Sequence, residues 1–463
     1  MIGEQILSNI THRWLIAVAV VTCMACPAQA QFGFGGIARV GVVGGVSVDA
    51  EGAVQNASAI ERAGWLKEMR EAIHEPTGEL ADKTELRMIS LSKLQSEIAH
   101  AKANDRPLSD EVLYLAGLQR IEYIFVYPEQ NDIVLAGPAE GWVVRHDASV
   151  VGKTTGRPVL QLEDLLTALR TTEASRQKAI SVSIDPTPEG EVRLNRLLAQ
   201  VRTSGAGFDP TSLELAMREA FGPQTVKLTT VASDSRMAHT LVAADYRMKR
   251  LAMNLEESPV AGLPSYMSMI RDGGSNQKLQ PRWWMSCDYD AILHSDDMLA
   301  WKLTGRGIKA MSEDELVDNQ GTRSGTGRAN KFAQRWADLF TEKFDELCAH
   351  NAAFGDLRNV MDLNIVATVI SGHELEKVAG CDFGLLKGEA DQLPTPSWKT
   401  PKTITPECSF VKGRVGWTVS ASGGVELNPW QVVSQQAKSD SAVKVVYAKA
   451  VKPTAAQGDA WWW

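Results

Sequence analysis

The chain has 463 residues, of which 44% are hydrophobic and 22% charged, the balance of a globular protein with length for about two to three domains. Its formal net charge of −8 argues against a nucleic-acid binder, because such a protein needs a basic face to neutralise phosphates. Small-molecule and protein partners stay open.

Residues 1–30 have the pattern of a secretory signal peptide. The basic pair His12-Arg13 precedes an apolar run, residues 14–24, that is too short to span a bilayer, and Ala28-Gln29-Ala30 is a small-residue cleavage motif. The rival interpretation is a lipoprotein signal ending at Cys26, but Cys23 stands where a leucine-like residue is expected. We expect cleavage after Ala30 and a secreted or periplasmic protein with no transmembrane segment in the mature chain.

A small hairpin over residues 46–54, helices and one further strand are expected before residue 121. Residues 31–80 begin with a glycine-rich stretch, which follows no strand and opens no helix and so does not form a dinucleotide-binding loop. A helix is expected over residues 59–73, with residues 76–78 ending it, and a short helix is expected to start at residues 109–111. A strand over residues 86–91 leads into a helix that Ser92 caps.

Residues 121–142 carry the densest strand signal in the chain. Aromatic and β-branched side chains fill both faces of residues 121–127, which is typical of a buried strand. Pro128 ends this strand, and residues 133–136 form the returning strand of a hairpin. A turn with Glu140 then leads into a third strand at Trp142. This corner predicts either a pocket wall or a turn with Trp142 packed into the core.

Strands and helices alternate up to residue 258. Pro188 and Pro210 occupy first helical positions, and strands are expected over residues 179–184 and 224–231. The best helical period follows, over residues 235–255, with apolar side chains every three to four residues. Its basic side chains predict a solvated face, and an ion pair of the Asp245-Tyr246-Arg247 stretch with a neighbouring element is the alternative.

The second half of the chain begins after a linker rich in glycine and proline, residues 259–280. Short strands and turns are expected over residues 282–318, and two helices over residues 329–350 and 354–370. A hairpin of residues 413–420 and 424–427 follows. The tail, which ends in three tryptophans, is expected to be disordered.

These elements predict an α+β fold with a mixed N-terminal domain around the central β-hairpin, followed by an antiparallel-strand and two-helix region. The expected organisation in chain order is a signal peptide at 1–30, a glycine-rich segment with a helix at 31–80, an α/β mixed domain at 81–258, a linker at 259–280, antiparallel strands plus a helical hairpin at 281–380, a disulfide-stapled β segment at 381–430 and a low-complexity tail at 431–463.

Four cysteines remain after the expected cleavage, and an even number in an oxidising compartment predicts disulfides. We favour the pair Cys381 and Cys408, because it would close a loop-like segment and stabilise the fold by roughly 3–4 kcal/mol. Cys287 and Cys348 would then pair or stay as buried thiols. No CxxC motif occurs after residue 30, which argues against zinc ribbons and thioredoxin-like chemistry.

No complete catalytic motif is present. His373-Glu374 lacks the second histidine of a zincin, because Lys377 stands at that position, and Gly152-Lys153-Thr154 lacks the first glycine of a P-loop. We therefore expect no cofactor.

Two acidic groups are candidate sites. One surrounds a predicted hairpin near His294 and could bind Ca²⁺ or supply a general acid and base, with a solvated acidic turn as the alternative; its members are Asp288, Asp290, Asp296 and Asp297. The other lies at predicted strand ends, where binding sites gather, and a cap or turn role explains its carboxylates equally well; with Trp142, its members are Glu140, Asp185 and Glu189.

Four stretches together resemble an uncharacterised family of secreted bacterial proteins of unknown function, over roughly residues 85–320. They are RIEYIFVYPEQNDIVLAGPAEGW, SIDPTPEG, ADYRMKRLAMNLE and RWWMSCDYDAILHSDD. The resemblance implies a shared fold and export, and it transfers no catalytic residue.

We therefore expect a non-enzymatic extracytoplasmic protein that binds an envelope protein or a glycan. The alternative is a hydrolase of polysaccharide or peptide that uses a carboxylate pair such as Glu140 with Asp185, which would have to lie about 5–10 Å apart in one open cleft.

Overall fold

The computed structural model describes most of the chain after residue 58 and two short strands before it. The described residues are 46–48, 53–56, 59–204, 210–270, 279–388, 392–398, 400–405, 409–411, 417–419, 422–435, 437–450 and 460–463. They all belong to one compact unit, Gly33–Trp463. The expected signal peptide and Cys408 lie outside the described residues.

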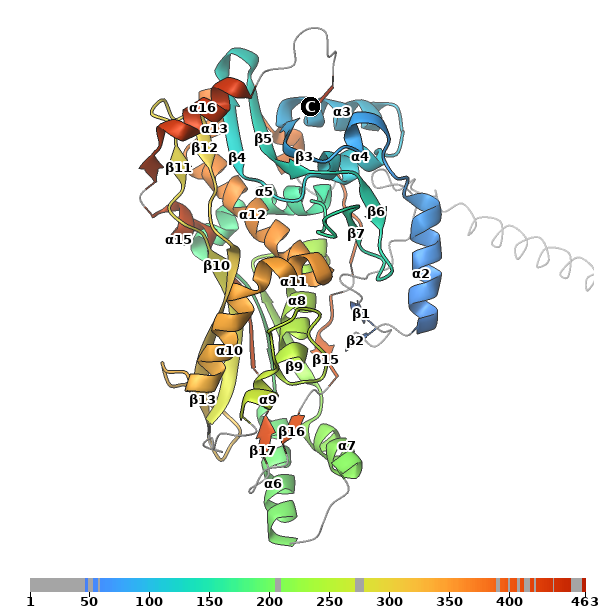
Figure 1. The fold of residues 1–463 in the computed structure, drawn as a ribbon, viewed down its shortest axis with the longest axis vertical. Helices are drawn as coiled ribbons and strands as arrows, with labels where there is room; N and C mark the ends of the chain where they lie inside the picture. The colour runs from blue at the N-terminus through green and yellow to red at the C-terminus, as the bar shows by residue number, and fades with distance from the viewer. Residues whose placement is uncertain are drawn as a thin grey trace, which may run out of the picture. The chain divides into compact units, whose positions relative to one another are not determined.

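A nine-stranded sheet forms one half of the fold (Figure 1). Its strands in spatial order are β1 (Val46–Val48), β2 (Ala53–Asn56), β15 (Thr403–Ile404), β9 (Gln224–Thr229), β8 (Ile180–Asp185), β18 (Ser422–Leu427), β10 (Leu279–Asp288), β13 (Gly307–Val317) and β14 (Arg323–Gly325). The strand β18 lies between β8 and β10, antiparallel to the first and parallel to the second. The predicted hairpin of residues 413–420 and 424–427 is therefore wrong.

A six-stranded sheet contains the predicted central hairpin. Its strands in spatial order are β19 (Lys438–Ser439), β11 (Leu293–His294), β12 (Ala300–Lys302), β4 (Tyr123–Tyr127), β5 (Asp132–Ala139) and β3 (Thr84–Ser90). The hairpin β4–β5 is in register from Tyr123 opposite Ala136 to Tyr127 opposite Asp132. Two ribbons complete the strands, one of β6 (Trp142–Val144) with β7 (Val150–Gly152) and one of β16 (Ser409–Val411) with β17 (Trp417–Val419). The α+β class and the central hairpin are confirmed.

The helices pack on and between these sheets. Their bounds are α2 Ala59–Ala72, α3 Leu91–Ala103, α4 Asp110–Leu113, α5 Leu162–Gln177, α6 Pro188–Ser204, α7 Pro210–Phe221, α8 Arg236–Ala252, α9 Tyr266–Ile270, α10 Lys331–Glu342, α11 Phe344–His350, α12 Ala352–Gly372, α13 Leu375–Ala379, α14 Gly384–Lys387, α15 Pro429–Val433 and α16 Ser441–Lys449. The central one, α12, is buried at every residue up to Ile370 and contacts α5, α8, α11 and α15. Within the described ranges, no helix has both the length and the apolar character needed to cross a membrane.

Both large sheets contain strands from residues 81–258 and strands from residues 281–380. In the predicted linker, Tyr266, Met267 and Ile270 of α9 are buried, and the Tyr266 and Trp283 rings lie 4.9 Å apart in an edge-on arrangement. The α3 cap also differs from its prediction. Ser90, not Ser92, precedes the helix, and its side chain accepts a hydrogen bond from the Lys93 backbone N–H.

The expected disorder of the tail is wrong for its described parts. The strand β19 pairs with β11 at one edge of the six-stranded sheet, and α16 lies beside β11 and β12 at the upper left of Figure 1. Residues 461–463 pair with β3 at the opposite edge. Tyr447 of α16 stacks on Tyr127 with ring centroids 5.1 Å apart, so the tail covers an aromatic face that the sequence pattern could not assign to it.

Candidate functional site

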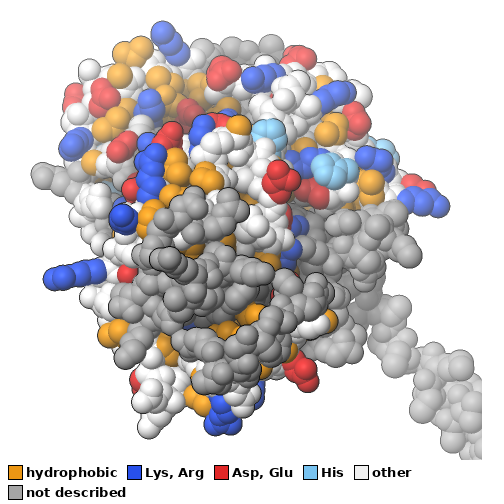
Figure 2. All heavy atoms as spheres, turned by 60° about the horizontal axis from the view of Figure 1, so that its bottom comes forward, with side chains coloured by type: hydrophobic (Ala, Val, Ile, Leu, Met, Phe, Trp, Pro, Cys, Tyr) orange, Lys and Arg blue, Asp and Glu red, His pale blue; other side chains and the backbone are white. Residues whose placement is uncertain are grey.

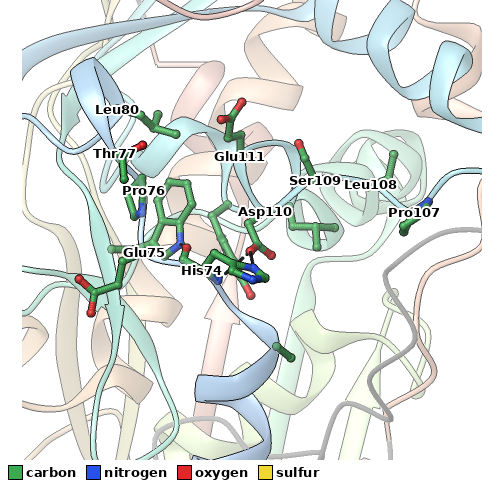
Figure 3. A pocket seen from close by; sticks show the side chains of 14 residues that line it. His74, Glu75, Pro76, Thr77, Leu80, Pro107, Leu108, Ser109, Asp110 and Glu111 are labelled. Atoms are coloured by element: carbon green, nitrogen blue, oxygen red, sulfur yellow. Dashed lines mark hydrogen bonds and ion pairs between the residues drawn. The ribbon is translucent and has the colours of Figure 1, made fainter.

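A cleft of about 580 Å³ opens between the end of α2, the start of α4 and the first residue of β6 (Figure 3). Its lining residues are Ala72, His74, Glu75, Pro76, Thr77, Leu80, Pro107, Leu108, Ser109, Asp110, Glu111, Leu113, Tyr114 and Trp142. This size is in the range of small-molecule sites.

Hydrogen bonds connect the three segments that line this cleft, hereafter the acidic cleft. The His74 backbone N–H donates to Oδ2 of Asp110 at 2.9 Å, and the Trp142 indole N–H donates to the His74 carbonyl at 3.1 Å. Trp142 is only 1% exposed, and its ring centroid lies 5.4 Å from that of Tyr114. These two aromatic side chains therefore support the floor, while the polar groups form the rim.

The rim of the acidic cleft is negatively charged. Glu75, Asp110 and Glu111 line it, and among the described residues no lysine or arginine does. Lys153, which is not a lining residue, lies 3.4 Å from the Glu75 carboxylate, so Asp110 and Glu111 contribute most to the negative charge. The imidazole Nδ1 of His74 lies 3.5 Å from the Asp110 carboxylate, and its side chain is 85% exposed. Figure 3 shows this pair at the centre of the cleft, with Glu75 on one side and Ser109 on the other. The arrangement favours a ligand that carries a positive charge.

The buried side chain of Arg87 connects two segments that contribute residues to the acidic cleft. Its guanidinium donates to the carbonyls of Glu79, Leu80 and Asp82, and also to that of Ala116 at 2.9 Å. The first three carbonyls belong to the turn that contributes Leu80, and the fourth follows Tyr114 in the chain. Since Arg87 is 3% exposed, these four contacts satisfy a charge that burial would otherwise penalise.

Glu140 has a structural environment. Its carboxylate is 1% exposed and accepts hydrogen bonds from the Gln119 side chain and from the backbone N–H and hydroxyl groups of Thr154 and Thr155. Burial alone would raise the pKa of Glu140, but these hydrogen bonds outweigh it and lower the pKa. A carboxylate with a lowered pKa and occupied oxygens is poorly suited to act as a general acid.

The other strand-end candidates lie elsewhere. Asp185 ends β8 in the nine-stranded sheet and accepts a hydrogen bond from Ser183 at 2.8 Å, and Glu189 is exposed in the first turn of α6. Glu140 follows β5 in the six-stranded sheet. Among the candidates of this group, only Trp142 lines the acidic cleft.

The acidic hairpin binds the chain's own elements. Asp288 faces Arg306 at 3.9 Å, and Asp290 is exposed. Asp296 accepts a hydrogen bond from Ser439 of β19, and Asp297 pairs with Lys444 of α16 at 3.1 Å. In the part of the chain that the structure describes, no group of three or more His, Cys, Asp or Glu side chains is arranged to hold a metal ion.

No disulfide is present among the described residues. Cys287, Cys348 and Cys381 are free thiols, which rules out the Cys287–Cys348 bond in this structure and leaves Cys381 unbridged. Cys287 instead approaches the Met361 sulfur at 3.7 Å. Burial raises the pKa of Cys287 to about 12 and that of Cys348 to about 11, so both thiols are protonated and weakly reactive at neutral pH.

The predicted solvated basic face of residues 235–255 is wrong. Lys249 is 5% exposed and lies 2.8 Å from Asp245, and Arg236 bridges Asp164 of α5 and Asp356 of α12. Arg236 thus connects α8 to two other helices, whereas Lys249 also donates to the Ile184 carbonyl of β8 at 2.7 Å, so both charges are paired in the interior. On the face shown in Figure 2, the described acidic and basic side chains are interspersed.

His74, Asp110 and Glu111 were not among the predicted site residues. The sequence marks residues 76–78 as a helix end and residues 109–111 as a helix start, but no spacing rule connects them to each other or to Trp142. Only the tertiary fold brings them together.

Comparison with known proteins gives one match. Residues 182–266 match the profile of a family described as a protein of unknown function, DUF1598. This region runs from β8 to Tyr266 and includes Asp185, Glu189 and the buried Asp245–Lys249 pair, whereas the acidic cleft lies outside it. No curated protein and no solved structure matches the chain. A segment of the chain is thus similar to the DUF1598 family, whose function is unknown.

Proposed function

We propose that this protein is a non-enzymatic, extracytoplasmic binding protein, and that its acidic cleft takes an amino group carried on an apolar frame. The partner would be an envelope protein or glycan that presents such a group. The observation that carries the proposal is the combination of the Asp110 and Glu111 carboxylates with Leu108 and Leu113 in a cleft that, within the described part of the chain, no lysine or arginine lines. The location outside the cytoplasm rests on the pattern of residues 1–30.

Binding is favoured over catalysis by the same geometry. Asp110 already accepts a hydrogen bond from the backbone N–H of His74, and no hydrogen bond joins Ser109 to His74 within the described residues. A nucleophile needs a base within hydrogen-bond reach, and the cleft does not supply that pair. Glu140 is buried among protein donors and Asp185 ends a strand of the other large sheet, so the geometry gives the hydrolase alternative no support.

A panel of three small probes tests the ligand class. We expect n-hexylamine to shift the amide resonances of residues 74–77 and 109–111, with a dissociation constant on the order of 1 mM. The neutral n-hexanol and the anionic hexanoate should bind more weakly, and raised ionic strength should weaken the amine alone. Equal shifts from all three probes, or shifts from hexanoate alone, would refute an acidic recognition site.

A further inference from the structure

The outer edge of β3 carries a short segment from the far end of the sequence. The backbone N–H groups of Met88 and Ser90 donate to the carbonyls of Trp463 and Trp461 at 2.9 and 2.8 Å, and the Trp463 N–H donates to the Met88 carbonyl at 3.0 Å. Ile89 and Trp462 face each other across this antiparallel bridge. Residues 460–463, hereafter the Trp segment, thus extend the six-stranded sheet by one strand.

Side chains add specificity to this backbone pairing. Trp461 is 7% exposed and packs against the main core, while Trp463 packs against the apolar cluster that contains Met88. The Arg87 guanidinium lies 5.3 Å from the centroid of the Trp462 ring. The three tryptophans therefore contact three different sets of side chains on or beside β3.

The edge is held in place without help from the Trp segment. On its inner side, β3 pairs with β5, with Met88 opposite Ala136 and Ser90 opposite Val134. Ser90 also caps α3, and four backbone carbonyls hold Arg87. A preorganised edge with outward N–H groups and neighbouring side-chain pockets is how strand-addition sites bind extended peptides.

We propose that the β3 edge is a strand-addition site for an extended tryptophan segment, and that it binds the Trp segment of a second copy of this chain when its own segment is undocked. Every copy of the chain carries a Trp segment that fits the β3 edge. When two copies exchange these segments, each segment makes the same contacts with β3 that it makes within one chain. Residues 450–459 separate the Trp segment from α16, and they include Pro453 and Gly458. An empty β3 edge would also expose unpaired backbone groups, which favours refilling.

The test uses full chains and amide hydrogen exchange at two positions. In the isotope-labelled double variant Trp461→Ala/Trp463→Ala, the Met88 and Ser90 amides should exchange roughly ten-fold faster or more than in the native chain. Amides of the β4–β5 hairpin serve as the internal control for an intact sheet. Trp430→Ala is the matched variant, because Trp430 also lies under an arginine, Arg176 at 3.8 Å, but far from β3 in the sequence and in another element.

The labelled double variant is then mixed with an excess of unlabelled native chain. We expect the native chain to restore slow exchange at Met88 and Ser90, and the unlabelled double variant to leave exchange fast. If protection of the hairpin amides is also lost in the double variant, the single variant Trp463→Pro takes its place as the labelled chain, because it removes the Trp463 indole and the N–H donor to Met88 but keeps Trp461. The proposal would be overturned if the Met88 and Ser90 amides exchange as slowly in the labelled variant as in the native chain. It would also be overturned if the peptide Ala-Trp-Trp-Trp restores slow exchange but the native chain does not.

Discussion

The most informative single residues are buried carboxylates whose roles differ from those that the sequence suggests. Glu140 stands at the end of a strand next to Trp142, where a catalytic acid could lie, yet its oxygens bind protein donors. Asp245 stands on a helix face that the sequence predicts to be solvated, yet it is fully buried beside Lys249. Burial, which a single sequence does not display, decides both roles.

Glu140→Gln should destabilise the fold by about 2–4 kcal/mol at neutral pH, because an amide places an N–H group among donors that need an acceptor. The lowered pKa of Glu140 means that its contribution is present above the ordinary value of 4.5 and is lost as the pH falls. Urea unfolding at pH 7 and pH 3 should therefore show a smaller difference at the lower pH. Glu189→Gln, on an exposed side chain, is the control, and an equal effect of the two variants would contradict this role.

Asp245→Asn should show the opposite pH dependence. Burial raises the pKa of Asp245 to about 6, although Lys249 opposes the shift. A carboxyl group whose pKa is raised in the folded chain stabilises that chain at pH values below about 4, and this contribution is lost as the pH rises through about 6. Between pH 4 and pH 6, the free energy of unfolding of the variant should therefore rise relative to that of the native chain, by up to about 3 kcal/mol. If the stability of the variant relative to the native chain falls between pH 4 and pH 6, the attraction of Lys249 outweighs the effect of burial on the Asp245 pKa.

At the scale of elements, the sequence predicts local structure well and partners poorly. The alternation of residues 121–127 and the period of residues 235–255 report strand and helix directly, and β4 and α8 confirm both. The position of β18 between β8 and β10 depends on contacts made by residues more than a hundred positions apart. The predicted hairpin failed for that reason, since a local glycine turn says nothing about distant strands.

The cap of α3 gives an element-scale test. Ser90→Ala should cost about 1–2 kcal/mol of stability, because the Lys93 N–H would lose its acceptor in a buried position. Ser92→Ala should cost about 0.5 kcal/mol or less, since its hydroxyl donates to the Asn131 carbonyl at an exposed site. Chemical denaturation of both variants measures the difference, and a larger loss at Ser92 would contradict the observed helix start.

For the whole molecule, the α+β class could be predicted because it follows from the succession of local patterns. The acidic cleft could not, because His74, Asp110 and Trp142 come from three separate elements and share no motif. The interior also differs from the expected one, since buried ion pairs rather than disulfides join its elements. Arg120 with Asp362 and Arg236 with Asp164 connect residues distant in the chain.

The free thiols can be checked on the intact protein. When the chain is denatured without reductant and alkylated, mass spectrometry should find Cys287, Cys348 and Cys381 each modified. Under native conditions, Cys348 should react slowly because it is buried and its pKa is raised. A crosslinked peptide that joins Cys287 to Cys348 would contradict the structure.

The central claim is that the acidic cleft recognises a cation through Asp110 and Glu111. Calorimetric titration with n-hexylamine tests it most directly, on the native chain, on Asp110→Asn/Glu111→Gln and on Glu97→Gln, which removes an exposed carboxylate of α3 outside the cleft. We predict that the double variant binds roughly three- to ten-fold more weakly than the native chain and that Glu97→Gln binds equally well. Equal affinity of the double variant and the native chain, or a loss of the same size in Glu97→Gln, would contradict the claim.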